Sequence, residues 1–119
     1  MGVFMDTDIE KAYKFVNYRV ALMNQKHLLK VQTEERLNCY VSGGMFKADP
    51  GFIAFIGDLI NSGHKSLPIL DVNNTPIMIE DLQKFKDVLL SSYVEVVYAY
   101  WNDWMEIKDE RNLEKLANV

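Results

Sequence analysis

Hydrophobic positions recur every three or four residues along the first third of the chain, which is the spacing of an amphipathic helix. Thr7, followed three residues later by Glu10, has the signature of a helix N-cap with its capping box. The pattern therefore predicts a helix over residues 8–35 that pairs with another long helix through a narrow apolar stripe. The stripe consists of Ile9, Ala12 or Tyr13, Val16, Val20, Met23, His27 and Val31.

The pattern changes to strict alternation after Arg36. Apolar and polar residues alternate over 37–42, which predicts a short strand. Gly43-Gly44 can adopt positive φ angles and supports a tight turn, so we expect residues 45–48 to return as the second strand of a hairpin.

A short apolar helix and a second hairpin are expected next. Asp49-Pro50 favours a helix start, because Asp caps well and Pro suits the first helical position. Asn61-Ser62-Gly63 supplies the stop. Residues 67–71 and 76–79 have the pattern of two short strands, joined by a turn in which Asn tolerates left-handed backbone geometry. Residues 37–79 should thus form a small unit of β-hairpins and one short helix.

The last third of the chain, residues 80–116, is predicted to be a second long helix. Glu80 and Asp81 favour a helix start, and no Gly or Pro follows them. The alternative is a strand over Tyr93–Trp101, which is rich in strand-favouring residues, with Ser91-Ser92 as an interruption. Read as a helix, the segment has two apolar stripes. One consists of Leu82, Phe85, Leu89, Val96, Tyr100 and Ile107; the other, partly opposite, consists of Val94, Val97, Tyr98, Trp101 and Met105.

These elements predict an α+β protein, mainly α, in which two long antiparallel helices flank the small unit. A chain of 119 residues fits a single domain, residues 1–119, and can bury roughly two-thirds of its unfolded surface. The hydrophobic content of 49% supports a packed core.

The last helix carries more apolar surface than a chain of this length can cover. A helix that is apolar around most of its circumference must be covered on more than one side. Tyr, Trp and Met are enriched at protein–protein interfaces. We therefore expect a non-enzymatic homo-oligomer, most simply a dimer, that works in protein–protein interaction or assembly. The residues expected at its interface or shared core are Tyr93, Val97, Tyr100, Trp101 and Trp104.

The charges are unevenly distributed along the chain. Five cations and no acid occur over residues 11–30, whereas residues 79–119 contain nine acids and five bases. Two such segments attract each other when they pack side by side. The alternative function is a nucleic-acid-associated accessory factor, for which five cations would give modest and strongly salt-sensitive affinity. The cations in question are Lys11, Lys14, Arg19, Lys26 and Lys30.

No catalytic, cofactor or metal site is expected. Cys39, His27 and His64 do not have the spacing of a zinc site. Residues 71–75 resemble the start of a calcium loop but lack its later Gly and Glu, so they are interpreted as a hairpin turn. Residues 62–66 contain Gly, Lys and Ser but not in the order of a phosphate-binding loop.

The sequence is typical of a cytoplasmic protein. A single cysteine fits a reducing compartment, and the first residues have no basic start followed by an apolar core. No run of about 18 uncharged residues is present that would cross a bilayer, so no membrane association is expected.

Three segments resemble short uncharacterised proteins of T4-like tailed phages, including those of marine cyanobacteria. These segments are Tyr40–Asp49, Pro68–Ile77 and Asp109–Leu116. The resemblance covers about residues 37–116. It implies a role in virion assembly or host takeover in the host cytoplasm and implies no site residues. The order helix–β–helix also resembles prefoldin subunits, from which the predicted helix at 50–62 departs.

Overall fold

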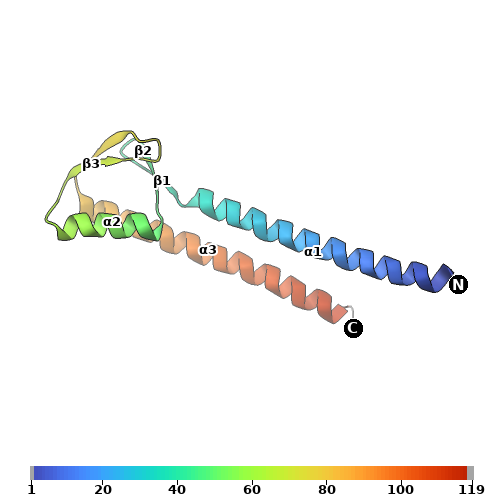
Figure 1. Cartoon of the computed structure of the whole chain (residues 1–119). Coiled ribbons are helices and arrows are strands. Elements are labelled where there is room, and N and C mark those ends of the chain that lie inside the picture. Colours follow the sequence, from blue (N-terminus) through green and yellow to red (C-terminus); the bar gives the residue numbers. More distant parts are fainter. Residues whose placement is uncertain (1, 118–119) are drawn as a thin grey trace. The chain divides into compact units, whose positions relative to one another are not determined.

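The computed structural model describes residues 2–117, and the side chains of residues 8–109. Two long helices are separated by two hairpins and a short helix, which confirms the predicted fold class (Figure 1). The segment Tyr93–Trp101 is helical, so the alternative of a strand there is wrong. The elements are α1 (Gly2–Arg36), β1 (Asn38–Val41), β2 (Gly44–Lys47), α2 (Pro50–Asn61), β3 (Leu67–Leu70), β4 (Pro76–Ile79) and α3 (Leu82–Ala117).

The chain divides into two compact units. The core unit is Gln32–Trp101, and the helical unit contains the described residues of Met1–Val31 and Asn102–Val119. Both long helices contribute to both units. That the 119 residues act as a single domain stays a prediction.

The first hairpin pairs β1 with β2 in the antiparallel register Cys39↔Phe46. Ser42 and Gly43 both have positive φ angles, 51° and 84°, as a tight two-residue hairpin turn requires. The turn therefore lies one residue before the predicted Gly43-Gly44, and Gly44 is the first residue of β2. Gly44 is buried, and a Cβ atom there would lie 2.7 Å from Cγ1 of Ile77. The absence of a side chain at Gly44 therefore lets β2 approach Ile77 of the second hairpin.

Asp71 organises the second hairpin, β3 with β4, and joins it to the first. Its Oδ1 accepts hydrogen bonds from the backbone N–H groups of Asn73 and Thr75, both at 2.9 Å. Its Oδ2 accepts a longer one, 3.4 Å, from the N–H of Met45. The Thr75 amide, helped by those of Asn73 and Met45, lowers the pKa of the Asp71 carboxyl below its ordinary value. Residues 71–75 are thus the predicted turn, and Asn74 has the expected positive φ of 59°.

Both ends of α2 follow local sequence signals. The Asp49 carboxylate accepts a 2.7 Å hydrogen bond from the N–H of Phe52, and Pro50 occupies the first helical position. After Asn61 the chain turns at Gly63, whose φ is +95°. These observations confirm the predicted start and stop of the short helix.

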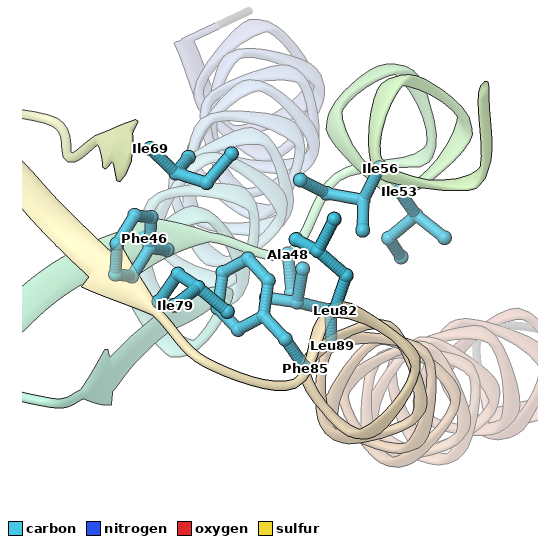
Figure 2. Packing of buried hydrophobic residues seen from close by; sticks show 9 residues of the cluster. All are labelled: Phe46, Ala48, Ile53, Ile56, Ile69, Ile79, Leu82, Phe85 and Leu89. Carbon is cyan, nitrogen blue, oxygen red and sulfur yellow. The ribbon is translucent and has the colours of Figure 1, made fainter. Parts of the chain in front are cut away.

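The core of the chain lies in the core unit, where nine buried residues from β2, α2, β3, β4 and α3 and the segments next to them meet (Figure 2). Phe46 and Phe85 pack edge to face, with ring centroids 4.9 Å apart. The buried residues of α3 include Leu82, Phe85 and Leu89, so the first predicted stripe of this helix faces the core. The cluster consists of Phe46, Ala48, Ile53, Ile56, Ile69, Ile79, Leu82, Phe85 and Leu89.

The predicted start of the first helix is wrong. The helix begins at Gly2, so Thr7 lies within it and is not its N-cap. Residues 3–6 contain no Gly or Pro that would stop a helix, and the backbone therefore continues through the capping signal.

Candidate interaction surface

An apolar groove runs along α3; four of its residues are exposed, and the fifth, Tyr93, is half-buried and packs against the core cluster. We call this groove the α3 groove; it is lined by Tyr93, Val94, Val97, Tyr98 and Trp101, with a volume of about 430 Å³. Two of its aromatic side chains are well exposed, Tyr98 at 66% and Trp101 at 55%. All five lining residues carry large apolar or aromatic side chains, so the groove is a hydrophobic patch on the surface.

Helical geometry explains why α3 has both a buried and an exposed apolar side. Each residue advances about 100° around a helix. Val94 is therefore about 160° from the buried Val96, and Trp101 is about 140° from it. The first predicted stripe is buried over Leu82–Val96, while four members of the second stripe, Val94, Val97, Tyr98 and Trp101, are exposed.

The structure brings together three of the five residues expected at an interface. Tyr93, Val97 and Trp101 line the α3 groove, whereas Tyr100 and Trp104 are half-buried and do not. Two groove residues, Val94 and Tyr98, are absent from the expected set. The three-to-four residue spacing of the second stripe already contains them, so periodicity is the signal that finds them.

Trp104 is engaged within the helical unit. The Nζ of Lys26 lies 4.8 Å from the centroid of the Trp104 ring, a cation–π distance. Leu22 and Lys26 of α1 line one small groove together with Trp104, Ile107 and Lys108 of α3. The two helices run antiparallel in this unit (Figure 1).

The apolar stripe predicted to pair α1 with another helix is exposed, which corrects that expectation for a single chain. Every member of the stripe is exposed, including Tyr13 at 68% and Val20 at 50%. We call five of its members the α1 outer seam. They are Ile9, Tyr13, Val16, Val20 and Met23.

A different side of α1 is covered. Tyr18, Leu22 and Lys26 are half-buried, and Leu29 is fully buried. Val20 lies two positions from both Tyr18 and Leu22, which places it about 160° around the helix from each. Within the single chain the covered side differs from the predicted one because α1 has apolar residues on two nearly opposite sides, and periodicity alone does not rank them.

The cations proposed for nucleic-acid contact lie on one broad side of α1. Lys11, Lys14, Arg19 and Lys30 are exposed, whereas Lys26 is half-buried over Trp104. Lys14 and Arg19 are five positions apart and thus about 140° apart around the helix. All five cations fall within an arc of about 160°, that is, on one broad side of α1.

The polar groups of the described residues form structural contacts. The Cys39 thiol donates a hydrogen bond to Oγ of Ser92, with 3.1 Å between sulfur and oxygen, and so joins β1 to α3 in the core unit. Among the described residues, no three His, Cys, Asp or Glu side chains are grouped so that they could hold a metal ion. Within the same part of the chain, neither long helix has an apolar stretch of the length that crosses a membrane.

Comparisons with protein-family models, with curated proteins and with solved structures find no match for this chain.

Proposed function

We propose that this chain is a non-enzymatic assembly protein that associates with a second copy of itself and covers the α3 groove in doing so. The observation that carries the proposal is the uncovered side of α3, where the exposed Val94, Val97, Tyr98 and Trp101 form one groove with the half-buried Tyr93 at its edge, while the opposite side of the same helix is packed in the core. Contiguous apolar surfaces of this kind mark interaction sites in soluble chains.

The side chains in the groove are the types that contribute most to binding. Tyr and Trp dominate the energetics of protein interfaces when they become desolvated, and the groove offers Tyr93, Tyr98 and Trp101. Together with Val94 and Val97 they present rigid apolar area with few rotatable bonds. This composition supports a role in association rather than in chemistry.

The test compares the mass of the protein in solution with that of two variants, by sedimentation or light scattering at micromolar concentration. Tyr98→Glu introduces a charge into the groove and should shift the mass toward one chain. Tyr40→Glu is the matched control, because Tyr40 is 80% exposed on β1 and lies outside the groove. It should leave the mass of the wild-type oligomer unchanged.

Two results would contradict the proposal. One is a wild-type mass equal to a single chain at micromolar concentration. The other is a folded Tyr98→Glu protein whose mass equals that of wild type, since a charge cannot be buried in the groove at no cost.

The second candidate function, an accessory factor on nucleic acid, is supported by the four exposed cations Lys11, Lys14, Arg19 and Lys30 in a segment with no acid. Phosphate neutralisation by such a segment gives binding that weakens steeply with salt. A gel-shift titration at low salt should then show a complex that Lys11→Glu together with Lys14→Glu abolishes. No shift at tens of micromolar protein removes this function.

A further inference from the structure

We infer that the α3 groove of one copy binds the α1 outer seam of another copy, so that association joins two different surfaces of the chain. The inference rests on the proposed function, because it names the partner surface for the groove described above. Each chain offers one surface of each kind, and both are uncovered in the single chain.

The two surfaces have the same residue spacing. On α1 the exposed residues Ile9, Tyr13, Val16 and Val20 follow one another at steps of four, three and four. On α3 the groove residues Val94, Val97 and Trp101, together with the exposed Leu90 next to the groove, follow the same steps. Alternating steps of four and three are the repeat by which two helices interdigitate in a coiled coil.

The segments that contain the two surfaces have opposite charges. Residues 11–30 of α1 include five cations and no acid, and they contain all members of the α1 outer seam except Ile9. Residues 87–106 of α3 include four acids and no cation, namely Asp87, Glu95, Asp103 and Glu106. Packing α1 on α3 of the other copy therefore brings unlike charges together.

The two symmetric alternatives bring like charges together. Pairing α1 with α1 of the other copy sets one basic segment against another, and pairing α3 with α3 sets one acidic segment against another. Like-charge juxtaposition disfavours a pairing and selects against it. Charge thus distinguishes three pairings that the apolar residues alone would allow.

The experiment uses two variants in the full chain, Val16→Glu in the α1 outer seam and Val97→Lys in the α3 groove. Both valines are exposed, so both variants should retain the wild-type circular dichroism spectrum and unfolding midpoint of the isolated chain. Each variant alone should associate about 30-fold more weakly or worse, because a charge is buried against an apolar surface. Sedimentation velocity measures the association of each variant and of their equimolar mixture.

The mixture is the decisive sample. The α3 groove of the Val16→Glu chain and the α1 outer seam of the Val97→Lys chain are both unaltered, so one native contact can form between the two variants. We expect the mixture to associate at least about tenfold more strongly than either variant alone.

Other results overturn the inference and leave the proposed function standing. Weakening by Val16→Glu only shows that α1 pairs with α1, and weakening by Val97→Lys only shows that α3 pairs with α3. Weakening by both without recovery in the mixture excludes the proposed pairing as well. A wild-type protein that stays a single chain at micromolar concentration instead overturns the proposed function itself.

Discussion

The core unit and the helical unit differ sharply in how much apolar surface they bury. Of the buried hydrophobic side chains in the described part of the protein, all but Leu29 belong to the core unit. The helical unit instead exposes the α1 outer seam, while its covered contacts include the half-buried Leu22 and the Lys26–Trp104 pair.

The difference shows that the same helix can serve two purposes. Over Leu82–Val96, one side of α3 packs into a core that includes the aromatic rings of Phe46 and Phe85. A surface helix normally packs its apolar side against the rest of the protein. On α1, in contrast, the apolar α1 outer seam is exposed. The core unit holds nearly all the buried apolar side chains of the described residues, whereas the helical unit exposes the α1 outer seam.

Removing an aromatic ring from the core should have the largest effect on the free energy of unfolding. Phe85→Ala deletes a ring that packs on both Phe46 and Phe52 and should lower the free energy of unfolding by about 3–5 kcal/mol. Urea unfolding followed by circular dichroism measures it. Phe55→Ala is the control, because Phe55 is half exposed on α2 and should cost less than about 1 kcal/mol. Equal losses for the two variants would contradict the assignment of the core.

A pair of neighbouring leucines tests the helical unit. Leu29 is buried and Leu28 is exposed, so Leu29→Ala should lower the free energy of unfolding by about 2 kcal/mol. Leu28→Ala carries the same helix propensity change and should cost less than about 0.5 kcal/mol in the isolated chain. Thermal unfolding of dilute protein compares them. A larger loss of unfolding free energy for Leu28→Ala would mean that α1 is covered on the side that carries Leu28.

The smallest expected effect concerns pH and the join between the two hairpins. Because backbone amides lower the pKa of Asp71 in the folded state, its contribution to stability is present above its unfolded pKa, near 4, and is lost as the pH falls through the lower folded value. Asp71→Asn keeps a side-chain acceptor but no charge, so its stability relative to wild type should be lower at pH 7 and equal at low pH. Unfolding midpoints measured from pH 2 to pH 7 check this. A difference that stays constant across that range would contradict the role of the charge.

Local signals in the sequence predicted most elements of the core unit. The hairpin turn at Gly43, the cap at Asp49, the stop at Gly63 and the turn residue Asn74 each act on their own backbone, so reading them needs no knowledge of distant residues. The capping signal at Thr7 misled for the same reason, because a local preference does not prevent a helix from extending through it.

The amino-acid order by itself determined the order and type of the helices and hairpins and showed that α3 has two apolar sides. Only the tertiary structure decided which side is covered: Leu82–Val96 on α3, and Tyr18, Leu22 and Leu29 on α1, leaving the α3 groove and the α1 outer seam open. Periodicity measures how apolar a side is, whereas burial depends on which complementary surface reaches it, and that surface comes from residues far away in the chain.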